Sequence, residues 1–271
     1  MSILANIGSS TIGSLGSFGA FWRFSGRAIA LLPGTAMRRR DWALVMPQFF
    51  EVGVRTVPVM MITGVFVGLV LAAQAAAQLK SAGLEERMGV LVNLALIKEL
   101  GPVLAGVMLA GRVGGALTAE LGTMNVTEQI DALRAMGTDP IRYLVVPRFL
   151  ACVLLAPILT LYCDILGAWG GWFVAVVMES IPGEPYGYYT AEAVEKWDLF
   201  VGLAKAVVFG GSIGLICCFK GFTCRAGAAG VGRACTSSFV TSFIVILITD
   251  FYLLRMMQDI YNAVWGFQPL L

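Results

Sequence analysis

The feature that most constrains this chain is a series of five apolar segments, each long enough to cross a lipid bilayer. A spanning helix needs about 20 mostly apolar residues to cross about 30 Å of hydrocarbon. Of the 271 residues, 58% are hydrophobic and 13% are charged, whereas an ordinary soluble domain is about 25% charged. The sequence therefore predicts an all-α membrane protein and excludes a soluble globule or a disordered chain. The predicted spans cover roughly residues 53–78, 89–117, 149–177, 199–218 and 237–259.

The region before the first span differs from the rest. Residues 1–20 are rich in Gly and Ser and lack the basic start and compact apolar stretch of a cleaved signal peptide. Residues 21–50 mix aromatic side chains with arginine, a composition typical of a helix that lies in the membrane interface. We therefore expect two parts: a tail with an interfacial amphipathic helix over residues 1–52, and a five-span domain over residues 53–271.

The distribution of basic residues predicts the orientation, because cytoplasmic loops of membrane proteins carry an excess of Lys and Arg. With a cytoplasmic N-terminus, eleven basic residues fall on the inside and three (Lys80, Arg87 and Lys196) on the outside. Since five is an odd number of spans, the C-terminus is expected outside. The eleven are Arg23, Arg27, Arg38, Arg39, Arg40, Arg134, Arg142, Arg148, Lys220, Arg225 and Arg233.

Several kinds of chemistry lack their sequence signals. The chain has no His, and no GxxxxGK[ST] phosphate loop occurs in it, so we expect no catalytic site and no ATP binding by this chain itself. The net charge is +2 without a long basic run, which predicts no nucleic-acid partner. The six cysteines form no CxxC pair; the group from Cys217 to Cys235 could hold a metal, but buried thiols are the simpler interpretation, and we expect no metal site.

The stretch between the second and third spans predicts a short helix over about residues 123–137. Asn125 can cap it, with Glu128 at the third helical position, and Gly137 followed by Pro140 can end it. An apolar stripe lies on one face: Val126, Ile130, Leu133 and Met136.

This helix has two interpretations, because its stripe must be buried somewhere. It could dock in a groove on a cytoplasmic motor subunit, with Glu128, Asp131 and Arg134 on the surrounding surface. It could equally rest on the lipid interface or on its own bundle.

Three blocks of sequence resemble the MlaE/YrbE permeases, the membrane subunits of ABC transporters that work with MCE proteins. The blocks are KELGPVL (Lys98–Leu104), AGRVGGALTAELGTMNVTEQIDALRAMGTDPIRYLVVPR (Ala110–Arg148) and KGFTCRAGAAGVGRACTSSFV (Lys220–Val240). With their spacing they cover about residues 45–260. One departure is Ala229, which stands where many relatives carry Glu.

The resemblance implies an architecture and a function. It implies a homodimer, each chain with an N-terminal interfacial helix and five spans. The membrane would be a bacterial inner membrane or a plastid envelope, and the lack of a transit peptide favours the bacterial membrane. Two cytoplasmic ATPase subunits would bind ATP and Mg, leaving this chain without a cofactor, and an MCE-domain protein would stand on the opposite side. The transported material would be lipid, usually glycerophospholipid, and Thr123–Gly137 would be the coupling segment, including Ile130, Leu133 and Met136.

Charged residues within a span mark functional or structural polar sites. Lys98 and Glu99 lie about ten residues into the second span, near mid-membrane at 1.5 Å per residue. We expect Glu99 to face the lipid path and Lys98 to balance charge or touch a phosphate; the alternative is that both brace the bundle. Pro102 would kink the same helix beside them. Apolar residues of the first span suit acyl chains or ordinary membrane exposure equally well: Val59, Ile62, Phe66 and Leu69.

Five further charges are explained structurally. Arg55, Arg112 and Lys205 lie near span ends, where long side chains can extend their charge to the interface. Asp164 and Asp250 are deeper and are expected to find polar partners.

Three other classes of protein remain as alternatives. An ATP-independent carrier or channel would use Lys98, Glu99, Asp164 and Asp250 as an ion path. An intramembrane lipid enzyme would lack His, the commonest general base. A structural anchor for an MCE ring would show no turnover.

Overall fold

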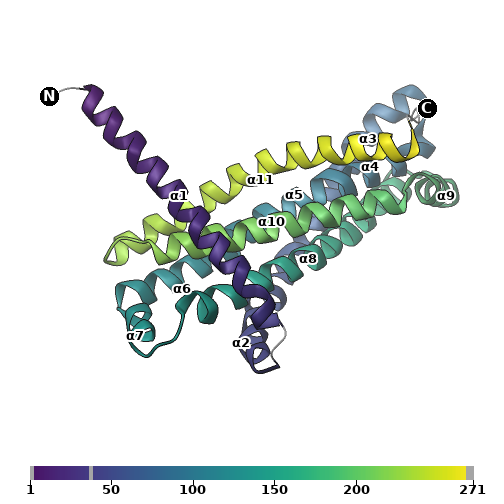
Figure 1. The fold of residues 1–271 in the computed structure, drawn as a ribbon. Coiled ribbons are helices and arrows are strands. Elements are labelled where there is room, and N and C mark those ends of the chain that lie inside the picture. The colour runs from purple at the N-terminus through teal and green to yellow at the C-terminus, as the bar shows by residue number, and fades with distance from the viewer. Residues whose placement is uncertain (1–2, 37–38, 267–271) are drawn as a thin grey trace.

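A computed structural model describes residues 3–36 and 39–266, and this part of the chain is helical without a β-strand. Helix α1 (Ile3–Ala36) crosses the outside of the bundle and leads to α2 (Arg39–Phe49). Five helical stretches are long and apolar enough to cross a membrane (Figure 1). Helix α1 and these five stretches confirm the predicted N-terminal helix and five spans. The bounds of the five stretches are Trp42–Ala82, Glu85–Val126, Ile141–Met178, Lys196–Phe222 and Ala228–Val264.

The first two candidate spans are assembled from shorter helical pieces. The first joins α2 through a π-helical turn, Phe50–Val54, to α3 (Val57–Ala82). The second begins with a 3₁₀ turn, Glu85–Arg87, and contains two π-helical turns, Leu96–Leu100 and Ala110–Gly114. Its α-helical parts are α4 (Met88–Ala95), α5 (Gly101–Leu109) and α6 (Gly115–Val126).

The remaining spans are more regular. The third consists of α8 (Val146–Trp172) flanked by the π-helical turns Ile141–Val145 and Phe173–Met178. The fourth is α10 (Lys196–Phe222), and the fifth lies in α11 (Ala228–Trp265). Two short helices occupy opposite ends of the bundle: α7 (Gln129–Ala135) and α9 (Gly183–Ala193) (Figure 1).

Helix α8 forms the centre of the bundle and α11 lies at its edge. In the most apolar stretch of each span, 67% of residues are buried in the third span and 17% in the fifth. The main core gathers Leu159 of α8, Phe209 and Ile213 of α10, Leu109 of α5 and Ile246 of α11. The outward face of α11 is therefore left for lipid or another protein.

Helices α3 and α8 approach each other through glycine. A Cβ on Gly64 would collide with the backbone of Cys163, and one on Gly68 would collide with the carbonyl of Gly167. Such contact requires residues without a side chain at the crossing. Helix α8 also continues through Pro157, so the third span is not interrupted at that residue.

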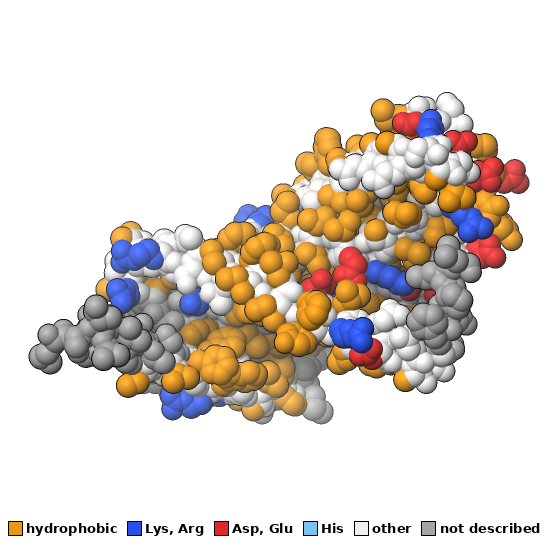
Figure 2. All heavy atoms as spheres, turned by 90° about the horizontal axis from the view of Figure 1, so that it is seen from above, with side chains coloured by type: hydrophobic (Ala, Val, Ile, Leu, Met, Phe, Trp, Pro, Cys, Tyr) orange, Lys and Arg blue, Asp and Glu red, His pale blue; other side chains and the backbone are white. Residues whose placement is uncertain are grey.

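Helix α1 is fastened to the bundle by aromatic and ionic contacts. Phe24 packs against Phe219 and Phe222 of α10, with ring centroids 5.5 and 5.6 Å apart. Arg27 pairs with Asp139, in the segment after α7, at 2.9 Å. Figure 2 shows hydrophobic side chains over much of one face; Asp and Glu lie in its middle and toward one end, where Lys and Arg also occur.

Candidate functional site

A buried ammonium group joins three spans. The Nζ atom of Lys205 in α10 lies 2.7 Å from Oε2 of Glu99 and 3.0 Å from Oδ1 of Asp250 in α11. It also donates a hydrogen bond to the backbone carbonyl of Lys98 at 3.1 Å. The Lys205 side chain has 0% of its surface exposed. A buried charge needs such partners, because removing it from water is otherwise very unfavourable.

Lys98 points to a different partner from Glu99. Its Nζ lies 2.7 Å from Oδ1 of Asp198, whose side chain is 6% exposed. Oδ2 of Asp198 accepts the backbone N–H of Glu195 at 3.1 Å, and the two residues form a capping box at the start of α10. Lys98 therefore lies level with the first turn of α10. The separate partners agree with the expectation that adjacent helical residues, about 100° apart, need not pair with each other.

The turn that carries both residues is π-helical. Leu96–Leu100 closes wider hydrogen-bonded rings than an α-helix does, and Pro102, which has no N–H to donate, follows at the start of α5. Wide turns of this kind occur frequently at functional sites. Pro102 is buried, and Gly101 before it has no room for a Cβ because the carboxyl group of Asp164 lies there.

The structure corrects the interpretation of Lys205, and it places Asp164 and Asp250 in different environments. Lys205 does not extend to an interface; it is enclosed by its two carboxylate partners. Asp250 has the polar partner that was expected. Within the described residues, Oδ1 of Asp164 is buried without a hydrogen-bond partner. Arg112 donates hydrogen bonds to the hydroxyl of Thr56 and the carbonyl of Glu51, at 2.6 and 3.3 Å.

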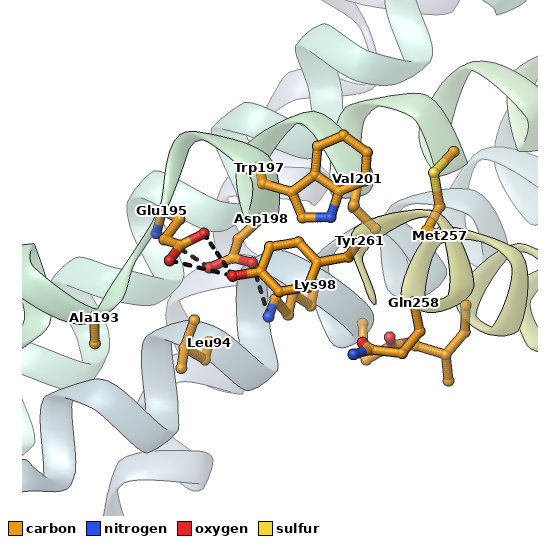
Figure 3. Close-up of a pocket in the computed structure, with 12 residues that line it drawn as sticks. Leu94, Lys98, Ala193, Glu195, Trp197, Asp198, Val201, Met257, Gln258 and Tyr261 are labelled. Atoms are coloured by element: carbon orange, nitrogen blue, oxygen red, sulfur yellow. Dashed lines mark hydrogen bonds and ion pairs between the residues drawn. The ribbon is translucent and has the colours of Figure 1, made fainter. Parts of the chain in front are cut away.

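A cavity of about 160 Å³ adjoins the cluster, between the second span, the start of α10 and the last part of α11 (Figure 3). The hydroxyl of Tyr261 donates to a Glu195 carboxylate oxygen at 3.3 Å. The ring of Trp197 lies beside that of Tyr261, with centroids 6.2 Å apart. The lining consists of Leu94, Lys98, Glu99, Ala193, Glu195, Trp197, Asp198, Val201, Leu254, Met257, Gln258 and Tyr261.

The apolar residues singled out in the first span lie mainly on an outer face. The side chains of Ile62 and Phe66 are each 62% exposed, and Val59 is 39% exposed. Leu69 instead packs against a buried cluster that includes Ala72. Within a single chain, Ile62 and Phe66 therefore contact the surroundings rather than an enclosed cavity.

The predicted helix between the second and third spans is shorter than expected and starts later. Helix α6 continues through Asn125, whose amide donates to the carbonyl of Cys224 at 3.4 Å. Glu128 precedes α7 with φ 61° and makes no side-chain cap. The expected capping box is therefore wrong, because Asn125 is engaged with a distant loop. The predicted end is correct: Gly137 has φ 74°, and the N–H of Thr138 reaches the Leu133 carbonyl at 3.0 Å.

The apolar stripe of α7 is divided between two environments. Ile130 is buried, and Leu133 packs against the same cluster near Val145 and Cys218. Met136 is 70% exposed. Glu128, Asp131 and Arg134 are also exposed, and the last two pair at 2.7 Å. Ile130 and Leu133 thus hold α7 on its own bundle, while the charged residues and Met136 form an exposed surface.

The bundle and its buried ion pairs define a multi-pass membrane protein with a polar site inside its helical core and a small exposed helix between two spans. Residues 45–256 match the family described as Permease MlaE. The chain therefore belongs to the MlaE permease family, as the three sequence blocks indicated.

Individual relatives agree with this assignment. A "Probable ABC transporter permease protein" of Rickettsia felis is 40% identical over 251 residues, covering 93% of this chain and 96% of the relative. The "Intermembrane phospholipid transport system permease protein MlaE" of Haemophilus influenzae is 34% identical, covering 88% and 93%. "Protein TRIGALACTOSYLDIACYLGLYCEROL 1, chloroplastic" of Arabidopsis thaliana is 35% identical, covering 86% and 67%.

Two parts of the site were not identified from the sequence. The role of Lys205 was missed although the signal was present, since it is a lysine inside an apolar run. Asp198 was not singled out in the sequence, and its contact with Lys98 identifies it as part of the site.

Proposed function

We propose that this chain is the membrane subunit of an ABC transporter that moves phospholipid between the inner membrane of a bacterium and an MCE-domain protein. The family assignment and the name of the Haemophilus relative, a phospholipid transport permease, support the substrate. Because the sequence contains no phosphate loop, ATP and Mg bind to separate ATPase subunits.

The observation that carries the proposal is the two-sided environment of α7. Buried Ile130 fastens α7 to the bundle, and exposed Asp131 and Arg134 are available to a cytoplasmic partner. Movement of α7 is transmitted to the third span, because Ile130 lies in one buried cluster with Leu144 and Val145. Arg148 of α8 also pairs with Glu120 of α6 at 2.7 Å. The ATPase subunits thereby displace the second and third spans together.

The subunit works as a homodimer with its N-terminus in the cytoplasm and its C-terminus in the periplasm. The outward face of α11 supports a partner in the membrane plane, since Phe251 and Tyr252 are exposed on it. The excess of Lys and Arg on one side supports the orientation. The MCE-domain protein then stands at the end that carries α9.

Lipid passes along a path that combines apolar and charged side chains. Val59, Ile62, Phe66 and Leu69 contact acyl chains, while Lys98 and Glu99, in the π-helical turn before Pro102, form its polar part. The ion pairs of Glu99 and Lys98 reach α10 and α11, so a shift of the second span changes them. Coupling requires that lipid and the ATPase state bias the same two conformations.

The test is purification of the tagged chain from its native membrane in mild detergent, followed by mass spectrometry of the bound proteins and lipids. An ATPase, an MCE-domain protein and retained phospholipid are expected. The purified assembly is then placed in liposomes with a fluorescent phosphatidylethanolamine, and transfer is measured with and without ATP. Transfer of lipid or ions by the isolated dimer without ATP would overturn the proposal in favour of a secondary carrier.

A further inference from the structure

We propose that the cavity beside the charged cluster binds the ammonium group of a zwitterionic phospholipid headgroup, of the ethanolamine or choline class. This inference rests on the proposed function and specifies its substrate. The cavity lies where the second span, the start of α10 and the last part of α11 meet (Figure 3).

The charges around the cavity favour a cation. Among the described residues, its lining contains one cationic side chain, Lys98, and three carboxylates, Glu99, Glu195 and Asp198. Asp198 neutralises Lys98, and Lys205 behind the wall is shared between Glu99 and Asp250. Glu195 accepts hydrogen bonds from Tyr261 and, as part of the capping box, from the Asp198 backbone. It makes no ion pair with the described residues, so an uncompensated negative charge stands at the cavity.

A second carboxylate oxygen can also accept a hydrogen bond. Oε1 of Glu99 is buried and has no hydrogen-bond partner in the described part of the chain, although Oε2 is bound by Lys205. An unused buried acceptor is unfavourable unless a donor reaches it. An alkylammonium ligand supplies such N–H donors, and a quaternary ammonium supplies the charge.

The aromatic side chains suit an organic cation rather than a bare metal ion. Trp197 and Tyr261 both line the cavity, with their rings tilted by 40° to each other. Ammonium groups are attracted to the faces of aromatic rings, and aromatic lining is the usual recognition chemistry for quaternary ammonium ligands. Among the described residues, no group of three His, Cys, Asp or Glu side chains is placed to hold a metal ion.

The dimensions and surroundings suit a headgroup and not an acyl chain. A volume of about 160 Å³ holds a few small groups, since one water occupies about 30 Å³ of liquid. Lys98 can stand near the phosphate, since it is the one cation that the described residues place in the lining. Apolar Leu254 and Met257 of α11 extend the wall toward the exposed face of that helix, where acyl chains can lie.

The experiment measures headgroup preference with the complete assembly. Delipidated protein is mixed with equal amounts of phosphatidylethanolamine, phosphatidylcholine and phosphatidylglycerol that carry the same acyl chains, and the retained lipids are quantified by native mass spectrometry. The variants are Glu195→Gln, Trp197→Ala and Tyr261→Phe. The matched control is Trp169→Ala, an exposed tryptophan of α8 outside the cavity.

We expect the wild type to prefer the two zwitterionic lipids over phosphatidylglycerol. Trp197→Ala and Glu195→Gln should each lower that preference several-fold, up to about tenfold, by loss of the aromatic face or of the charge. Phosphatidylglycerol retention and the control variant should be unchanged. If Trp197→Ala fails to fold, the isosteric Glu195→Gln decides alone.

Two contrary outcomes are distinguishable. Equal retention of all three lipids, unchanged in the variants, overturns the ammonium site and leaves phospholipid transport standing. Retention of no phospholipid of any class overturns both the proposed function and this substrate assignment.

Discussion

The ammonium group of Lys205 lies 2.7 Å from the Glu99 carboxylate, within a side chain that has no exposed surface. This pair links the π-helical turn of the second span to α10, and the contact with Asp250 extends the link to α11. Three spans thus share one charge. A change in the relative positions of the three spans changes the contacts of Lys205. The cluster therefore couples the second, fourth and fifth spans.

Replacing Lys205 by Met should destabilise the protein by about 3–5 kcal/mol, because Glu99 and Asp250 lose their buried cation. The measurement is thermal unfolding of the purified protein in detergent. Adding Glu99→Gln and Asp250→Asn to Lys205→Met should recover much of the loss, since the unpaired charges are removed. Lys196→Met, at an exposed lysine in the first turn of the same helix, is the control and should change little. A Lys205→Met protein as stable as the control would contradict the structural role of the pair.

The glycine contact between α3 and α8 makes a second prediction. Gly68→Ala would place a methyl group against the Gly167 carbonyl, and overpacking of this kind costs about 1–3 kcal/mol. The matched control is Gly187→Ala in α9, where a Cβ meets no atom within 4 Å. We expect a clear fall in the unfolding temperature for Gly68→Ala and none for the control. Equal stability of the two variants would show that the helices are not in such close contact.

The sequence predicts the spans well because bilayer crossing needs a property that can be read locally, a run of about 20 apolar residues. The end of the helix at Gly137 could also be predicted from local sequence, since a helix often ends at a glycine with positive φ. Gly64 and Gly68 stand four residues apart, a spacing that indicates close helix packing. The residues that they contact, Cys163 and Gly167, lie about a hundred positions further along the chain. Which helices touch is a tertiary property.

The same limit explains the errors at the site. Lys205 was assigned to an interface because a single sequence shows the depth of a charge only roughly and does not show which carboxylates surround it. Asn125 has the local chemistry of a helix cap, yet its amide reaches Cys224, 99 positions further along the chain. A long-range contact therefore overrode a local preference.

The stability of α9 should fall at alkaline pH. Burial raises the pKa of the Tyr186 phenol, whose hydroxyl accepts a hydrogen bond from Asn93 at 3.4 Å. A raised folded-state pKa means that the neutral phenol is favoured by folding. Its contribution is complete below the unfolded value of about 10 and is lost as the pH rises through the folded value.

The test of Tyr186 compares unfolding temperatures of the wild type and Tyr186→Phe at pH values from about 8 to 11, a range that brackets the ordinary tyrosine pKa. The difference between the two proteins cancels the titration of the other tyrosines. We expect the wild type to lose more stability than Tyr186→Phe at the alkaline end. Parallel curves would show that the phenol is accessible to water and not buried between α9 and α4.

The exposed face of α7 should be required for coupling but not for folding. Replacing Glu128, Asp131 and Arg134 together by Ala removes only solvent-exposed groups and one surface ion pair, which contributes at most about 1 kcal/mol. The unfolding temperature should therefore stay near that of the wild type. With the partner ATPase bound, ATP hydrolysis should continue while ATP-dependent phospholipid transfer falls, by at least about tenfold if the surface makes charge-assisted contacts worth about 1.4 kcal/mol or more.

Ile130→Ala is the matched contrast, because it alters the other side of the same helix. Ile130 is 1% exposed, and truncation of a buried isoleucine costs about 2–5 kcal/mol. That variant should lose stability as well as coupling, whereas the triple variant should lose coupling alone. Unchanged coupling in a stable triple variant would move the ATPase contact away from α7. Destabilisation of the triple variant would instead show that its charges support the bundle and do not contact a partner.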